Sequence, residues 1–276
     1  MRYFLAFLIL MLAILAFGKW QLNRQVNAQL VNFCPATLPK TEVVTEASIN
    51  LYPAIVKQWL QRSKIIGKEM VQTVHLKQTG SLKTKPDADW MPFEAEQWNT
   101  VKRPGFIWRA YVRMAPGIYL DGLDTYENGQ GHMLIKALSL FPVVNSSGPT
   151  IDQGTLLRNL AEISWFPSAA LSEYIQWEPG DSLSARATMT WGEVTASGMF
   201  YFNSDADLIR FEAQRYFDRS EGPTLEKWIV TNHAFKDFHG VRIPYQSEVS
   251  WDLASGMFTW AKMEVTEIEY NQSCSR

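Results

Sequence analysis

The stretch YQSEVSWDL at residues 245–253 carries apolar side chains at four of its five odd-numbered positions, the exception being Ser247, with polar side chains between them. A period of two is typical of a β-strand with one buried face and one wetter face. The same alternation recurs at residues 106–114 and 183–191. Turn-forming pairs separate such strands, among them Asn-Gly at 128–129 and Gly-Glu at 192–193. Because short turns join antiparallel neighbours, the pattern predicts an antiparallel meander.

The number of strands decides the shape of the sheet. Counting from residue 71 gives about eleven strands, and one twisted sheet of that size tends to curl. Two amphipathic helices are expected at residues 52–62 and 153–164, with Asn50 and Asp152 as their caps. The sequence therefore predicts a mainly β (α+β) fold, an open or half-closed β-barrel whose helices cover its mouth or concave face.

The chain begins with an apolar run, YFLAFLILMLAILAF at residues 3–17, which follows Arg2 and precedes Lys19. Its length and charged start fit a secretory signal. An extension to Trp20, with Lys19 snorkelling, fits a retained membrane anchor. Both interpretations stay open, and under each of them the rest of the chain is exported from the cytoplasm. We expect a signal peptide or anchor over residues 1–20, a spacer over 21–48 and a single β-rich domain over 49–276.

Composition and cysteine usage exclude several functions. A net charge of −2 gives no basis for a nucleic-acid partner. Cys34 and Cys274 can form a disulfide that ties the ends of the domain together, or remain two free thiols. The sequence contains neither G-x-S-x-G nor H-E-x-x-H, and its cysteines and histidines lack zinc-ligand spacing. It therefore predicts no metal, no cofactor and no enzyme activity.

The strongest functional hint is the aromatic content, 11 Trp, 10 Tyr and 15 Phe. Aromatic rings on alternating strands either fill a core or line an apolar cavity. Among the strand residues, Trp108, Met114 and Trp191 are candidate cavity residues.

A second hint is the pair formed by Arg158 and Glu162, four residues apart on the second helix. Such a pair is usually a surface feature contributing about 0.2–0.5 kcal/mol. Alternatively, it points into the barrel mouth beside Trp165 and Phe166, where it binds a polar head group above an apolar tail. A separate acidic group, made up of Asp121, Asp124 and Glu127, is expected to be solvated.

Three stretches resemble a known family. They are RPGFIWRAYVRMAPG at 103–117, SGPTIDQGTLLRNLAEISWFPSA at 147–169 and FHGVRIPYQSEVSW at 238–251. Together they resemble a bacterial family known as a domain of unknown function, the DUF6544/DUF6920 type, over about residues 52–270. The C-terminal strands and their G-V-x-I-P turn are similar to LolA-type lipoprotein carriers. That resemblance implies an incomplete antiparallel barrel, closed by helices, which holds acyl chains or other apolar ligands.

The observations and the resemblance predict an exported binding protein of the bacterial cell envelope, on the periplasmic face, either membrane-anchored or secreted. Its expected partners are a lipid or other apolar small molecule and, through the N-terminal segment, the membrane. The alternatives are an envelope interaction protein without a ligand and an envelope enzyme acting on a lipid or glycan. The sequence does not indicate an oligomeric state.

Overall fold

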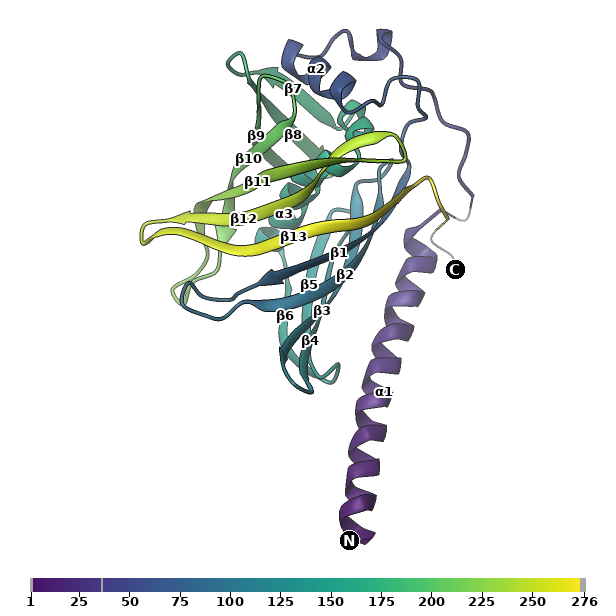
Figure 1. Ribbon diagram of the computed structural model, residues 1–276, viewed down its shortest axis with the longest axis vertical. Helices are drawn as coiled ribbons and strands as arrows, with labels where there is room; N and C mark the ends of the chain where they lie inside the picture. Colours follow the sequence, from purple (N-terminus) through teal and green to yellow (C-terminus); the bar gives the residue numbers. More distant parts are fainter. Residues whose placement is uncertain (1, 36, 274–276) are drawn as a thin grey trace.

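The computed structural model describes residues 2–35 and 37–273 of the chain. Its strands form one antiparallel sheet of thirteen, in the order β6-β5-β4-β3-β2-β1-β13-β12-β11-β10-β9-β8-β7 (Figure 1). The strands are β1 (Thr73–Leu82), β2 (Met91–Thr100), β3 (Gly105–Ala115), β4 (Ile118–Glu127), β5 (Gln130–Ala137), β6 (Phe141–Ser147), β7 (Ile175–Pro179), β8 (Ser184–Trp191), β9 (Val194–Phe202), β10 (Leu208–Phe217), β11 (Thr224–Phe238), β12 (Val241–Leu253) and β13 (Gly256–Tyr270).

The sheet consists of two meanders, which we call the first wing (β1–β6) and the second wing (β7–β13). They join in the middle, where β1 pairs with β13 from Val74 opposite Tyr270 to Leu82 opposite Ala261. The sheet curls into the predicted half-barrel (Figure 1). The strand count exceeds the expected eleven. The edge strands β6 and β7 are short and contain Pro142 and Pro179, which weakens their strand signal.

Two helices cover the concave side and one end of the half-barrel. Helix α3 (Pro149–Glu162) lies within the curl and packs against β9, β5 and β10. Strand β6 ends just before Gly148, which adopts a φ of 111°, and α3 begins directly after this glycine. The helix therefore starts earlier than expected, and Asp152, the expected cap, lies in its first turn. Helix α2 (Ala54–Arg62) likewise begins after Pro53 rather than at Asn50. Short 3₁₀ turns occur at Ala47–Ile49, Ile163–Trp165 and Pro167–Leu171.

The end of the half-barrel beneath α2 is filled with side chains. Trp59 of α2 packs against Trp177, with ring centroids 6.1 Å apart. It also lies 6.2 Å from Phe200 and 5.9 Å from Phe202. At this end, the aromatic residues therefore pack on one another.

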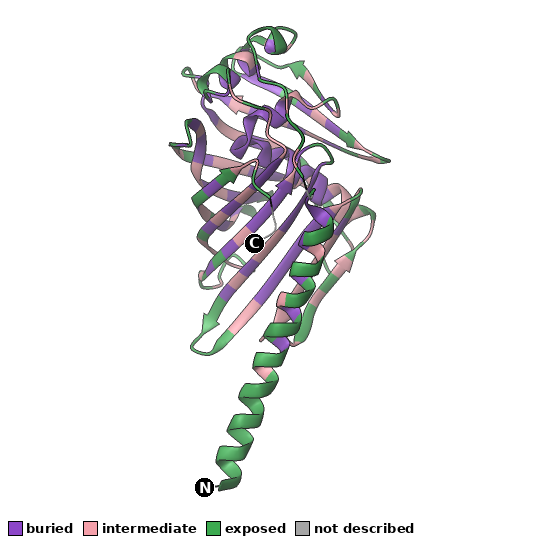
Figure 2. Cartoon of the chain, turned by 90° about the vertical axis from the view of Figure 1, so that its right-hand side faces the viewer, coloured by how far each residue is buried: buried purple, intermediate pink, exposed green. Residues whose placement is uncertain are grey.

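Helix α1 (Arg2–Phe33) is longer than the expected leader and continues through the first part of the predicted spacer. Its last turns bury Leu22, Val26, Leu30 and Phe33. Three of these, Val26, Leu30 and Phe33, pack against the outer face of the first wing, in a cluster with Trp98, Ile107, Leu123 and Leu134. Its N-terminal half projects beyond the sheet and is almost wholly exposed (Figure 2). The expected disulfide remains a prediction, since Cys274 lies outside the described residues.

Candidate functional site

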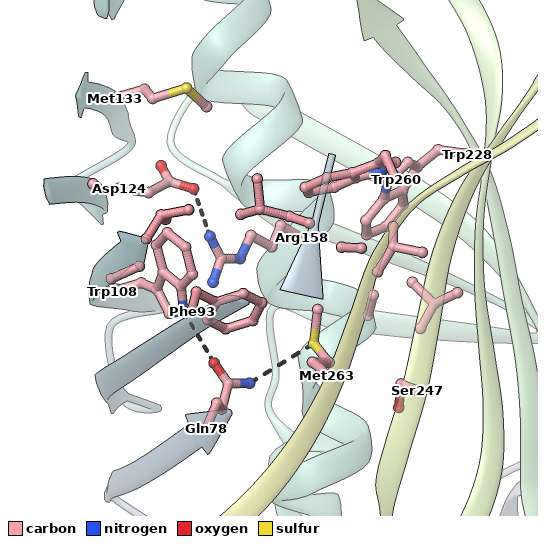
Figure 3. A pocket seen from close by; sticks show the side chains of 18 of the residues that line it. Gln78, Phe93, Trp108, Asp124, Met133, Arg158, Trp228, Ser247, Trp260 and Met263 are labelled. Carbon is pink, nitrogen blue, oxygen red and sulfur yellow. Dashed lines mark hydrogen bonds and ion pairs between the residues drawn. The ribbon is translucent and has the colours of Figure 1, made fainter. Parts of the chain in front are cut away.

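A cavity of about 530 Å³ occupies the other end of the half-barrel, between α3 and the two wings (Figure 3). It reaches the surface at Thr84 and Asp218, two exposed residues that follow β1 and β10. The half-barrel is therefore filled beneath α2 and hollow at these strand ends.

The walls of the cavity are mainly apolar and come from both wings. From the first wing they include Met91, Phe93, Trp108, Ala110, Val112 and Leu120, and from the second wing Trp228, Val249, Trp251, Phe258, Trp260 and Met263. Gln78 adds a polar group to the first wing. Its side-chain oxygen accepts a hydrogen bond from the indole of Trp108 at 3.0 Å.

Arg158 of α3 lies in the cavity wall at the centre of a buried polar network. Its Nη1 lies 2.6 Å from Asp124 Oδ2, and its Nε lies 2.7 Å from Glu162 Oε1. Its Nη2 donates to Gln97 Oε1 at 2.9 Å. Burial alone would lower the pKa of Arg158, but the pairing with Glu162 and Asp124 raises it above its usual value. The charge of Arg158 is thus held in place by two carboxylates, which together exceed it by one negative charge.

The acidic group on β4 was expected to be solvated, and the structure corrects this expectation. Asp124 is only 5% exposed because it faces the cavity and pairs with Arg158. Asp121 is 3% exposed and accepts a hydrogen bond from Ser139. Glu127, at the end of the strand, is half-buried.

A second arginine of the cavity, Arg215 of β10, was not singled out from the sequence. Its guanidinium lies over the ring of Trp228, at 4.8 Å from the centroid, and 6.0 Å from that of Trp251. Over residues 2–35 and 37–273, no ion pair or hydrogen bond reaches this guanidinium. Burial lowers the pKa of Arg215 to about 10, which keeps it charged at neutral pH.

Room for Arg215 comes from Gly154 in α3. A Cβ atom at position 154 would lie 3.2 Å from Arg215 Nε, closer than side chains normally approach. The sequence did carry a signal for this site. Arg215 has the same strand parity as Phe211, Ala213 and Phe217, which predicts an inward-facing side chain.

The structure brings four of the seven predicted ligand-binding residues to the cavity. These are Trp108, Arg158, Glu162 and Trp165. Phe166 belongs to the adjoining filled core. Met114 is 51% exposed, because the β3–β4 hairpin projects past the cavity. Trp191, at the end of β8, packs against Tyr174 with centroids 5.6 Å apart. The prediction that Phe166, Met114 and Trp191 line the cavity is therefore corrected.

The described part of the chain contains no candidate metal site. Within it, no group of three or more His, Cys, Asp or Glu side chains is arranged to hold a metal ion.

Comparison with known proteins finds one family. The family of unknown function DUF6544 matches residues 42–263, most of the chain. No curated protein matches the sequence.

Solved structures similar to this one include two whose chains are covered almost completely. The first is a LolA superfamily protein from Nitrosomonas europaea, with a TM-score of 0.43, 10% identity and coverage of 79% of this chain and 94% of that one. The second is a domain from Vibrio parahaemolyticus described as an outer membrane lipoprotein-sorting protein, with a TM-score of 0.41, 10% identity and coverage of 79% and 91%.

Proposed function

We propose that this chain, which belongs to the family of unknown function DUF6544, is an exported, membrane-anchored protein that holds a lipid or another apolar molecule. The cavity carries this proposal. Its volume of about 530 Å³ lies within the range of ligand sites, and its apolar walls with few polar groups are typical of them. Apolar walls that face water cost about 25 cal/mol per Å², which an apolar guest recovers.

The N-terminal half of α1 supports the membrane anchor. Residues 2–20 extend roughly 28 Å as a helix, close to the ~30 Å hydrocarbon core of a bilayer. The helix then continues without a break onto the first wing. Gly18, where a signal would be cleaved, is buried against Leu140. A continuous, packed helix at this point favours a retained anchor over a cleaved signal.

Exposed apolar residues of the first wing lie at the strand ends where Gly18 of α1 packs against Leu140 of the β5–β6 turn. We call Met114, Ile118, Phe141 and Val143 the apolar rim; each is exposed. Lys19 lies 5.5 Å from the ring of Tyr111, which places this rim beside the end of the exposed helix. Apolar residues that flank a membrane helix gain free energy by entering the lipid interface. The rim therefore supports contact between the first wing and the bilayer.

The apolar rim also favours a second candidate, an envelope interaction protein without a ligand. In that case a protein partner covers the rim, and the cavity stays without a guest. Occupancy of the cavity separates the two candidates.

Binding of methyl parinarate, a neutral fluorescent apolar probe, tests the proposal on the full chain in nanodiscs. Ala110→Phe and, separately, Ala161→Phe place a ring in the cavity, and each should lower probe affinity by at least about tenfold. Ala54→Phe, an exposed position on α2, is the matched control and should bind as the wild type does. Equal binding by all four proteins, with melting temperatures showing that they are folded, would contradict the proposal.

A further inference from the structure

We propose that the cavity selects anionic amphiphiles and that Arg215 binds their head group, a carboxylate or a phosphate. This inference rests on the proposed function and names the chemical class of the guest. The observation behind it is a guanidinium that makes no ion pair and no hydrogen bond with any described residue, in a mainly apolar wall.

An unpaired charge in such surroundings is costly. Removing an ion from water is unfavourable unless another charge or several hydrogen bonds replace the water. Arg215 has an aromatic ring on one side and α3 on the other, and no described residue accepts a hydrogen bond from it. An anion entering the cavity would supply the missing partner.

The neighbouring carboxylates do not fill this role. Asp124 and Glu162 are the closest acidic groups inside the cavity, and both make short ion pairs with Arg158. Asp218, at the opening, is exposed and makes no ion pair among the described residues. The N–H groups of Arg158 are thus used by the protein. Arg215 is attracted by the same carboxylates only at longer range, without a hydrogen bond, and keeps its donors for a guest.

The shape of the site matches an oxyanion. A guanidinium presents parallel N–H groups that bind two oxygens of a carboxylate or phosphate at once. The apolar walls around Trp251 and Trp260 remain for the tail.

Competition tests this inference with the full chain in nanodiscs. Methyl parinarate fills the cavity, and octanol, octanoate and octyl phosphate compete with it. Octanol is used below its solubility limit and the two anions below their micellar concentrations. We expect at least one anion to displace the probe about 10- to 100-fold better than octanol. The stronger of the two anions identifies the source of the charge as a carboxylate or a phosphate.

Arg215→Gln should remove the preference for anions and leave octanol within about twofold of the wild type. Arg215→Lys, which keeps the charge, should retain part of it. Arg186→Gln, at an exposed position of β8, is the matched control and should compete as the wild type does. Equal displacement by octanol and both anions in the wild type overturns the inference and leaves the proposed function intact. Loss of octanol binding in Arg215→Gln overturns it as well, because Arg215 would then be structural. Failure of methyl parinarate to bind the wild type defeats the proposed function itself.

Discussion

Asp207 joins three separate elements at the filled end of the half-barrel. It lies in the turn between β9 and β10 and accepts two hydrogen bonds from Arg62, at the end of α2, each at 3.1 Å. Arg242 of β12 donates two more, at 2.9 and 3.0 Å. Bidentate pairs of this kind are among the strongest polar contacts in proteins, and here they attach α2 to the sheet.

Asp207→Asn should therefore destabilise the protein by about 3 kcal/mol, since two arginines lose the charge that pairs them. Asp237→Asn is the control. Asp237 pairs with Lys64 near the same helix end, but both side chains are exposed, so its loss should cost less than about 1 kcal/mol. Chemical denaturation followed by tryptophan fluorescence measures both variants. Equal losses of unfolding free energy would contradict the assigned role of Asp207.

The hydrogen bonds of Asp207 with Arg62 and Arg242 also predict how the stability of the protein depends on pH. Burial alone would raise the pKa of Asp207, but the hydrogen bonds from Arg242 and Arg62 lower it below its ordinary 3.8. A depressed pKa stabilises the fold fully above the unfolded value, and this stabilisation disappears as the pH falls through the folded pKa. The stability difference between wild type and Asp207→Asn should stay constant from about pH 5 to 8 and shrink below about pH 4. A difference that grows on acidification would contradict this.

At this scale, strand parity predicts which side of the sheet a residue faces, but not how far the cavity extends. Trp108 and Met114 share a parity, and only Trp108 lines the cavity. Parity also places Arg215 inside, although it was not singled out from the sequence. Arg158 and Glu162 were identified because their helical spacing is local. Their third partner, Asp124, lies 34 residues from Arg158 in sequence and could not be paired with it from the sequence alone.

Among the elements, α3 lies close to β5 because Gly131 has no side chain. A Cβ atom there would collide with the Thr155 hydroxyl and lie 2.9 Å from the carbonyl oxygen of Ile151. The amide of Gly131 also donates to Asp152 at 2.6 Å. The position of α3, and with it the position of Arg158, depends on this close contact.

Gly131→Ala should lower the unfolding free energy by roughly 1–3 kcal/mol, because the helix must move away from the strand. Gly122→Ala, on the neighbouring β4, meets its nearest atom at 3.5 Å, an ordinary contact. We expect this control to stay within about 0.5 kcal/mol of the wild type or to gain stability, since alanine restricts the unfolded chain. Denaturation midpoints at unchanged slope measure both, and an equally stable Gly131→Ala would contradict the proposed packing.

The elements themselves were largely predictable, and their ends were not. Alternation located the strands and amphipathicity located α2 and α3, because both signals are local. The long α1 was underestimated. Leu22, Val26 and Leu30 recur at helical spacing, but the polar residues between them resemble a spacer. That face is apolar because it packs on a sheet whose position the local sequence does not reveal.

At the scale of the whole molecule, the pairing of β1 with β13 determines the shape. It brings together residues about 190 positions apart and joins the two wings into one curl. The alternation of side chains along a strand does not predict this pairing, since any strand with a suitable alternation could pair with β1. The joined sheet also sets where the cavity opens. Its opening lies at the C-terminal ends of β1 and β10. The apolar rim, on β3, β4 and β6, lies at the same end of the sheet, because β3 is parallel to β1 two strands away and carries Met114 near its C-terminal end.

This arrangement predicts how the molecule sits on a bilayer. Figure 1 shows α2 at the end of the half-barrel away from the N-terminal half of α1. If α1 spans the membrane, the rim residue Ile118, which is exposed at the start of β4, lies near the lipid. Asp205 lies at the far end, in the β9–β10 turn that Asp207 attaches to α2. A fluorophore on Ile118→Cys should therefore be strongly quenched by brominated lipids in nanodiscs, and one on Asp205→Cys should not. The unsubstituted chain, labelled under the same non-reducing conditions, measures any signal from Cys34 and Cys274. Equally weak quenching at both sites would mean that the half-barrel lies away from the bilayer, and a guest would then have to cross water to reach the cavity.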